Sequence, residues 1–309
     1  MQASVVVVGV TSLTVAIPVE GFPVEYQPES FPAWARAGLG GVGAQVSRIL
    51  RTLGNQVSLC TVVGADTIGR TLRAELRACG LHGPGVLPAP ESSLGVALVA
   101  PDGRRRGHPY LGAVAVAEYP PETFLRSAAG ADLAVLTNVG LARPLLPFAR
   151  ELGVPVAVDV HVIADVDDPY NRPWLDVADV VFCSHERLPC SPSEWVGQVL
   201  GRYPGCAIAA VGCGGAGSVL GLRDGTLVTV PAAAPRGVRN TLGAGDALFA
   251  SFLHGWLATG NPIEALTSAT VYAGWKVGGS HPSQGFPEPE EFDRLRAANP
   301  VRARVTRWR

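Results

Sequence analysis

The sequence has almost no lysine: Lys276 is the only one in 309 residues, and arginine supplies the rest of the Lys+Arg total. A P-loop needs a lysine followed by serine or threonine, whereas Lys276 is followed by Val277. A Schiff-base mechanism would have to use this single lysine. The sequence therefore excludes a P-loop nucleotide site and leaves one residue for imine chemistry.

Paired cysteines are also missing. The six cysteines are scattered without a C-x-x-C pair, which argues against a zinc site and against a disulfide framework. The six histidines show no metal-ligand spacing, and neither H-E-x-x-H nor G-x-S-x-G occurs. Metalloprotease and serine-hydrolase chemistry are therefore not expected.

Neither sign of charge is in excess, and no long apolar run is present. The formal net charge is −1 without a basic stripe, so we expect no nucleic-acid partner and no acidic membrane surface. No apolar run approaches the roughly 20 residues of a membrane span. Val5–Val8 begins without a basic leader, so we expect a soluble, cytoplasmic protein. The one dense basic cluster, Arg104–Arg106, is expected at a hairpin tip.

The sequence is rich in apolar residues, 47% of the chain, in short runs that alternate with helix-like stretches. This alternation predicts an α/β fold with a parallel sheet covered by helices on both faces. The carboxyl ends of the strands should share one edge, where ligands usually bind. Predicted strands are Val5–Val8, Val57–Val63, Leu133–Leu136, Val154–Val158, Val180–Cys183, Cys206–Val211 and Ser218–Leu222; predicted helices are Val42–Leu53, Thr71–Cys79, Pro144–Leu152, Trp195–Arg202, Ala247–Thr259 and Ile263–Lys276.

Two segments break this alternation, at about residues 11–36 and 94–112. Both have β-character without an intervening helix, and Leu94–Ala100, a turn at Asp102-Gly103 and Arg104–Leu111 predict a hairpin. We therefore expect a small second sheet. It is either a lid over the active site or a plain edge extension that forms a dimer contact, and the two interpretations are compatible.

Two glycine groups imitate the dinucleotide fingerprint G-x-G-x-x-G. The glycines within 38–43 follow a segment unsuited to a buried strand, and those within 212–217 precede a second strand instead of a helix. The fingerprint requires strand, glycine turn and helix in that order. A dinucleotide-dependent dehydrogenase is therefore not predicted.

The strongest signal is the segment Asn240–Asp246, NTLGAGD, which directly precedes a predicted helix. Its glycines allow a tight turn in which several backbone N–H groups point to one place at the helix N-terminus, and such a place binds anions. A carboxylate there would repel phosphate, unless its function is to accept a proton from an attacking hydroxyl. Asp246 is thus either a general base beside an anion hole or only the helix cap.

With this signature, the sequence resembles the ribokinase-like sugar kinases of the PfkB family. Gly243–Asp246 matches the signature near that family's C-terminus, and Gly40–Gln45 with Leu53-Gly54 and Val63–Gly69 matches the N-terminal one. Further matches, in the family's order, are Val158-Asp159, Val211-Gly212 and Gly279. The resemblance implies one three-layer αβα ribokinase-like domain over residues 1–309 with a small β-sheet lid.

The resemblance also implies roles for individual residues. Asp246 would deprotonate the acceptor hydroxyl, and the amides of Gly243, Ala244 and Gly245 would form the anion hole. Residues implied at the acceptor site are Thr14, Gly40, Gly41 and Gln45; those at the ATP site are Ser184, Ala210, Gly212, Gly215 and Thr241; those toward metal ions are Glu186 and Asn240. Mg²⁺ would arrive with the nucleotide phosphates.

The sequence departs from the family pattern at several of these positions. Thr14 stands where the family often has an aspartate that grips vicinal hydroxyls, and a single hydroxyl cannot do this as a carboxylate does. Asn240 replaces an aspartate that helps to hold a monovalent cation in potassium-dependent relatives, which weakens the expectation of potassium. Residues 184–187 read S-H-E-R where the family has N-x-x-E, and Ala210 replaces a frequent threonine.

The predicted function is transfer of the γ-phosphoryl group of ATP to an alcohol of a small sugar, polyol or nucleoside. The departures leave a second hypothesis, a non-catalytic ribokinase-fold protein that binds a metabolite in a regulatory role. A third is a phosphosugar kinase whose charged substrate is bound by Arg104–Arg106. The small sheet would form the contact of a homodimer.

Overall fold

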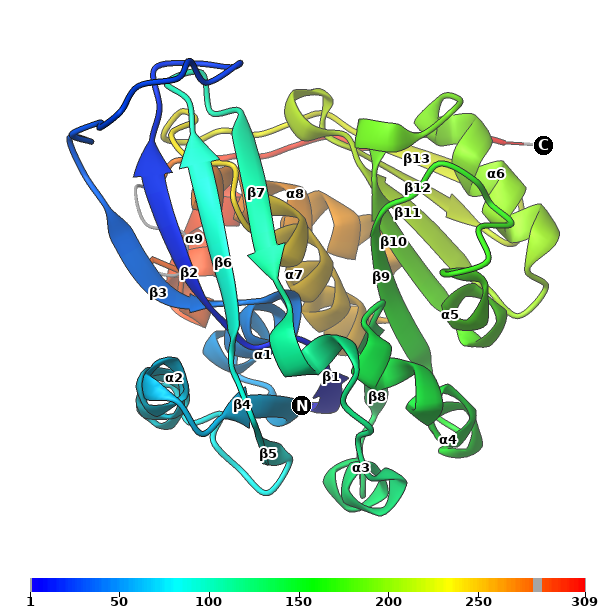
Figure 1. The fold of residues 1–309 in the computed structure, drawn as a ribbon. Helices are drawn as coiled ribbons and strands as arrows, with labels where there is room; N and C mark the ends of the chain where they lie inside the picture. Colours follow the sequence, from blue (N-terminus) through cyan, green and yellow to red (C-terminus); the bar gives the residue numbers. More distant parts are fainter. Residues whose placement is uncertain (1, 280–284, 309) are drawn as a thin grey trace.

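A computed structural model describes residues 2–279 and 285–308 and is built around a ten-stranded sheet (Figure 1). Strands β11 to β5 of this sheet run parallel, whereas β12, β13 and β14 extend one edge in antiparallel fashion. The carboxyl ends of the parallel strands therefore share one edge. In spatial order the strands are β14 (Arg304–Arg307), β13 (Thr226–Val230), β12 (Ser218–Leu222), β11 (Ile208–Gly212), β10 (Val180–Ser184), β9 (Val156–Val162), β8 (Leu133–Thr137), β1 (Ser4–Val8), β4 (Gln56–Gly64) and β5 (Val86–Ala89).

Helices cover both faces of this sheet, which confirms the three-layer α/β prediction. In β1, Val6 and Val8 pack into one hydrophobic cluster and Val5 and Val7 into the other, because successive side chains of a strand point to opposite faces. The first face carries α3 (Pro121–Ser127), α4 (Leu146–Glu151), α5 (Arg172–Val177) and α6 (Pro192–Arg202); the second carries α1 (Val42–Thr52), α2 (Thr67–Ala78), α7 (Ala244–Thr259), α8 (Pro262–Val277) and α9 (Pro289–Ala298).

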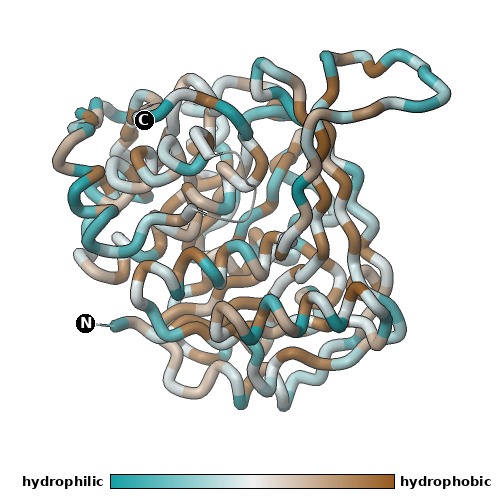
Figure 2. The backbone as a smooth tube through the Cα atoms, turned by 90° about the vertical axis from the view of Figure 1, so that its left-hand side faces the viewer, coloured by the Kyte–Doolittle hydropathy of each residue, from teal (hydrophilic) through white to brown (hydrophobic). Residues whose placement is uncertain are grey.

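A second, four-stranded sheet is also present, as predicted, and we call it the small sheet (Figure 1). Its strands, in order, are β3 (Arg36–Gly40), β2 (Ser12–Pro18), β6 (Ser93–Val99) and β7 (Arg105–Tyr110). β6 and β7 form the expected antiparallel hairpin. The first of the two β-segments expected from the sequence ends at Gly40 and not at residue 36, because β3 leads directly into α1. The loop between β2 and β3 stands out from the body of the molecule (Figure 2).

The start of α2 differs from the sequence prediction. The helix begins at Thr67 and not at Thr71, because the side chain of Asp66 caps it by accepting a hydrogen bond from the N–H of Gly69 at 2.6 Å. Asp66 also accepts from the N–H and the hydroxyl of Ser92, both at 2.8 Å. These bonds lower the pKa of Asp66, with the bond from Gly69 as the largest cause.

The predicted helix Pro144–Leu152 is wrong as a single helix. A 3-10 turn covers Gly140–Leu145, and α4 covers only Leu146–Glu151. Pro144 and Pro147 both lack a backbone N–H, so neither can donate the hydrogen bond that would continue one regular helix. Elements that the sequence did not predict are β5, β13, β14, α3, α5 and α9.

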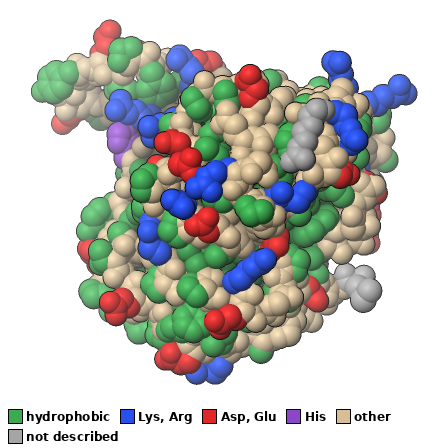
Figure 3. Space-filling model, turned by 90° about the vertical axis from the view of Figure 1, so that its right-hand side faces the viewer, with side chains coloured by type: hydrophobic (Ala, Val, Ile, Leu, Met, Phe, Trp, Pro, Cys, Tyr) green, Lys and Arg blue, Asp and Glu red, His purple; other side chains and the backbone are tan. Residues whose placement is uncertain are grey.

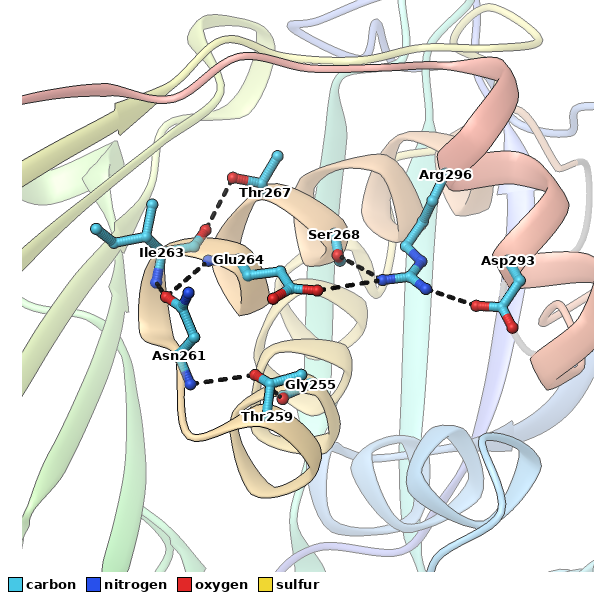
Figure 4. Close-up of polar contacts among 9 residues, drawn as sticks. All are labelled: Gly255, Thr259, Asn261, Ile263, Glu264, Thr267, Ser268, Asp293 and Arg296. Carbon is cyan, nitrogen blue, oxygen red and sulfur yellow. Dashed lines mark hydrogen bonds and ion pairs between the residues drawn. The ribbon is translucent and has the colours of Figure 1, made fainter. Parts of the chain in front are cut away.

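Helix α9 is held against α8 by polar contacts of Arg296 (Figure 4). The guanidinium donates to the hydroxyl of Ser268 at 3.3 Å, and it forms ion pairs with Glu264 at 3.9 Å and Asp293 at 2.6 Å. These contacts fix the helix that carries Lys276 in its last turn. None of the helices in the described part of the chain combines the length and apolar character needed to cross a membrane.

Candidate active site

The predicted anion-binding turn lies at the N-terminus of α7. Gly243 precedes the helix with φ of 77°, in the left-handed region that favours glycine. The N–H of Ala244 donates to the carbonyl of Thr241 at 3.2 Å, whereas the N–H groups of Gly245 and Asp246 have no acceptor within the first turn. No side chain caps this helix, so the alternative that Asp246 serves only as a cap is wrong.

The carboxyl of Asp246 lies at this turn and is partly buried. Burial raises the pKa of Asp246 to about 6; the nearby charges of His161, Arg105 and Lys276 oppose this shift, and Asp159 adds to it. A carboxyl with a pKa close to neutrality is suited to accept a proton in a reaction at physiological pH.

The only lysine of the chain lies beside the same turn, which the sequence did not indicate. Lys276 is 1% exposed, and its ammonium donates to the carbonyl of Leu242. A Cβ placed on Gly243 would lie 3.7 Å from Lys276 Nζ. Burial lowers the pKa of Lys276 to about 8, and the charge of Asp246 opposes this shift. A buried positive charge therefore accompanies the free N–H groups.

The carboxyl end of β9 brings two further titratable side chains toward Asp246. The buried carboxylate of Asp159 accepts a hydrogen bond from the N–H of His161 at 2.8 Å. His161 has φ of 57°, a left-handed conformation that is uncommon for a residue with a Cβ. The charges of both residues act on the pKa of Asp246. The sequence pointed to Asp159 only through a family match and did not indicate His161.

The residues expected at the acceptor site gather where β3 meets α1. Gly40 lies against Thr14, because a Cβ on Gly40 would collide with the Thr14 hydroxyl. Gly41 has φ of 85° and precedes α1. The side chain of Gln45 is 6% exposed; its Nε2 donates to the carbonyl of Leu39 at 2.8 Å, and its Oε1 has no partner among the described residues. Contact of these residues with an acceptor stays a prediction.

Most of the residues expected at the ATP site lie at or near the carboxyl ends of β10 and β11. Ser184 and Gly212 are register partners on these strands, and Gly215 lies in the next turn. Ala210 is buried inside β11. A cavity of about 650 Å³ lies beside this turn and not around Asp246; its lining includes His185, Cys213, Ala216, Ser218 and Thr229.

Thr241 makes a contact that the sequence did not indicate. Its hydroxyl donates to the carbonyl of Gly103, at the tip of the β6–β7 hairpin, at 2.7 Å. Because Leu242 also packs against the hydrophobic cluster of the small sheet, this sheet touches the segment that leads into the anion-binding turn.

Glu186 and Asn240 do not form a preassembled metal site. Glu186 is exposed, whereas Asn240 is buried and its Oδ1 accepts from the N–H of Leu242 at 2.9 Å. Within residues 2–279 and 285–308, no three His, Cys, Asp or Glu side chains gather as a metal cluster. A Mg²⁺ ion carried by nucleotide phosphates fits such a site, because it needs only one or two protein carboxylates and keeps several waters.

A glycine turn at a helix N-terminus, with a carboxyl of raised pKa beside it at the edge of a parallel sheet, is the arrangement expected of a ribokinase-like phosphotransferase. The chain belongs to the pfkB family of carbohydrate kinases, whose model matches residues 2–135 and 195–289. It is 28% identical over 278 residues to the acarbose 7(IV)-phosphotransferase of Actinoplanes sp., covering 88% of this chain and 91% of that protein.

Solved structures show the same fold. A microbiome-derived acarbose kinase has a TM-score of 0.85 at 22% identity, with 96% of this chain and 100% of that chain covered. Ribokinase from Giardia lamblia has a TM-score of 0.80 at 19% identity, covering 96% and 100%. The nucleoside kinase of Burkholderia thailandensis in complex with inosine has a TM-score of 0.77 at 19% identity, covering 96% and 98%. The predicted family and kinase activity are confirmed by the family match, which makes the chain an ATP-dependent carbohydrate kinase. The predicted fold class is confirmed by the solved structures.

Proposed function

We propose that Asp246 takes the proton of the acceptor hydroxyl while the hydroxyl oxygen attacks the γ-phosphorus of ATP. The new P–O bond forms as the bond from the γ-phosphorus to the bridging oxygen breaks, and ADP leaves with that electron pair. The single observation that supports this role is the position of Asp246: a carboxyl with its pKa raised to about 6 stands in the first turn of a helix whose N–H groups attract phosphate. The amides of Gly243, Ala244 and Gly245 would offset charge on the phosphoryl oxygens.

The acceptor that we propose is a sugar-like molecule with several hydroxyl groups, bound between the start of α1 and the small sheet. Thr14, Gly40, Gly41 and Gln45 lie there, and the names of the relatives include acarbose, ribose and nucleoside kinases. The small sheet would serve as a lid. A lid suits this reaction, because water competes with the substrate hydroxyl for the phosphoryl group.

ATP would lie along the carboxyl edge, between the cavity beside Gly212–Gly215 and the anion-binding turn. Glu186, near Ser184, is the carboxylate proposed to face the Mg²⁺ ion that the phosphates carry, and this ion would supply charge neutralisation. Asn240 offers no negative charge, so we do not propose a potassium requirement.

Dependence on ATP agrees with a cytoplasmic location. On the face shown in Figure 3, charged side chains of both signs are mixed, which gives no support for a nucleic-acid partner.

We also propose that two copies associate through the small sheet. The loop between β2 and β3, which extends from this sheet, carries Tyr26 and Phe31, each 90% exposed. Large aromatic side chains grouped on a projecting element are typical of interfaces. The molar mass in solution tests this association.

The experiment that tests the kinase mechanism is ADP release from Mg-ATP over a panel of acarbose, sugars, sugar phosphates, polyols and nucleosides. Asp246→Asn should abolish turnover and leave ATP binding unchanged, because only proton acceptance is lost. The control is Asp176→Asn, an exposed aspartate of α5, which should keep full activity. If Asp246→Asn retains more than roughly a hundredth of the activity, the general-base role is wrong.

The absence of ADP release with every compound of the panel would have a separate meaning. Combined with undetectable Mg-ATP binding, it would contradict the kinase mechanism and favour a non-catalytic metabolite-binding protein. The intact Gly243–Asp246 turn argues against that alternative.

A further inference from the structure

The carboxyl end of β9 contains one residue more than the strand beside it. Phe182 of β10 is paired with Asp159 and Ser184 with Val162, so three steps along β9 match two along β10. Such a bulge occurs often next to an active site, where it changes the direction of a side chain. His161 lies in this bulge and is exposed, and within the described part of the chain it is the only non-glycine residue with a positive φ, 57°. The backbone therefore holds this imidazole in a way that regular strand geometry does not provide.

Strand β9 lies between the two binding regions that we propose. The ATP region includes Ser184 of β10 and Gly212 of β11, and α7 begins beside it, because a Cβ on Gly212 would lie 3.4 Å from Leu248. The acceptor region lies beyond β1, where the N–H of Ala44 in α1 donates to the carbonyl of Val10 at 3.1 Å. In the order β11-β10-β9-β8-β1, the ends of β9 and β8 separate the two regions (Figure 1). The γ-phosphorus and the acceptor hydroxyl must meet near these ends.

The end of β9 also lies beside the general base. The ring of Phe182 is 5.0 Å from that of Phe249 in α7, and Asp159 is the register partner of Phe182, so the three residues form one layer. Asp246 precedes Phe249 by three residues and lies on the same side of α7, one turn nearer to its N-terminus. His161 lies two residues beyond Asp159 in the direction of the carboxyl end. Both groups therefore extend past this layer at the same edge of the sheet.

The charges and contacts of His161 agree with this placement. Among the charges that oppose the effect of burial on the pKa of Asp246, that of His161 is the largest. The backbone N–H of His161 is bound to Asp159, whereas its two ring nitrogens have no hydrogen-bond partner among the residues that the structure describes. The imidazole is thus exposed, close to the base and free to bind a ligand.

We propose that His161 binds the acceptor through a hydrogen bond to a hydroxyl group next to the one that is phosphorylated; this inference rests on the proposed function. A neutral imidazole has one N–H donor and one acceptor nitrogen, and a hydroxyl group both donates and accepts. Of the residues expected at the acceptor site, only Thr14 and Gln45 have polar side chains, whereas the phosphoryl group already has the free N–H groups of α7 and the ammonium of Lys276. A second hydroxyl held at β9 would orient the acceptor toward Asp246.

The test is steady-state kinetics of His161→Gly with the compound of the panel above that the wild type phosphorylates with the highest kcat/KM. A left-handed φ favours glycine, so this variant removes the imidazole while its denaturant midpoint stays at or above that of the wild type. The acceptor kcat/KM should fall about 10- to 100-fold, mostly through KM, because a hydrogen bond and the orientation of the acceptor are both lost. The affinity for Mg-AMP-PNP, measured by calorimetry, should be unchanged. The matched control Val162→Ala, at the next residue of β9, should behave as the wild type in every assay.

Two further readouts separate binding from a structural role. His161→Asn should recover part of the loss, because asparagine tolerates a left-handed φ and has a donor and an acceptor. Among monodeoxy analogues of the same acceptor, the one that lacks the bound hydroxyl should react equally with the wild type and His161→Gly.

Unchanged acceptor kinetics in His161→Gly would overturn the proposal while Asp246→Asn still abolishes turnover. Weaker Mg-AMP-PNP binding at a constant acceptor KM would assign His161 to the nucleotide and overturn it as well, and a lowered denaturant midpoint would assign it to the fold. Absence of both turnover and Mg-AMP-PNP binding in the wild type would instead refute the proposed function, and this inference with it.

Discussion

The plot of kcat/KM against pH should be bell-shaped, because two groups at the site titrate on either side of neutrality. Asp246 must be ionised to accept a proton, and its pKa is raised to about 6 by burial. Lys276 must be protonated to carry its charge, and burial lowers its pKa to about 8. We expect kcat/KM for the acceptor to be greatest between these values.

The two limbs should differ in depth. Below about pH 6 the rate should fall roughly tenfold per pH unit, because the protonated fraction of the base is inactive. Above about pH 8 the rate should fall and then level off, because Lys276 supports the transfer without taking part in proton exchange. The loss there should be about 10²- to 10³-fold, comparable with removal of one donor from an oxyanion site.

Lys276→Met tests the assignment of both limbs. The variant should lack the alkaline limb, since the titrating group is gone. Its acid limb should move to higher pH, because Lys276 lowers the pKa of Asp246 and this effect is removed. The pH profiles of kcat/KM are measured at saturating Mg-ATP. Arg106→Ala, which removes an exposed cation from β7, serves as the control. An acid limb that stays in place in Lys276→Met would refute the interaction between the two groups.

Two further changes test the contacts around the site. Thr241→Val removes the bond to Gly103 and should cost about 1 kcal/mol or less of global stability, while amide hydrogen exchange at the hairpin tip speeds up about five- to tenfold; unchanged exchange would show that the hydroxyl does not hold the tip. Gly43→Ala should destabilise the fold by about 2–4 kcal/mol in denaturant unfolding, because its Cβ would lie 2.5 Å from the carbonyl carbon of Gly9. The control Gly201→Ala, in α6 with open space around the Cβ, should be neutral or slightly stabilising.

The sequence predicted those parts of the fold that depend on local patterns. The valines of β1 alternate between two clusters because a strand buried on both faces needs apolar residues throughout, and such runs are visible without a structure. The N-terminus of α7 could also be predicted, because the types and order of its glycines and aspartate form a recognisable signature. By contrast, the cap of α2 was missed, because Asp66 stands outside the apolar repeat from which the helix was predicted.

The remainder of the site could not be predicted, because it is assembled from distant segments. Lys276 comes from the last turn of α8, His161 from the end of β9 and Arg105 from the small sheet. No spacing in the sequence connects these residues with Asp246, and only the packing of the helices and sheets brings their charges to one place. The consequences of the departures at Thr14 and Asn240 could not be predicted either. A family pattern shows which residue relatives have at a position, but it does not show which other side chain takes over its role in this fold.

The bond from Thr241 to Gly103 joins residues 138 positions apart in the chain and has a thermodynamic consequence. One partner precedes the turn that we propose receives the phosphate, and the other lies at the tip of the β6–β7 hairpin. If phosphate binding favours the docked tip, then docking must raise phosphate affinity by the same factor, because coupling between two binding events is reciprocal. A ligand that separates the hairpin tip from Thr241 would therefore weaken nucleotide binding without contacting the nucleotide. A ligand that stabilises the docked tip would strengthen nucleotide binding.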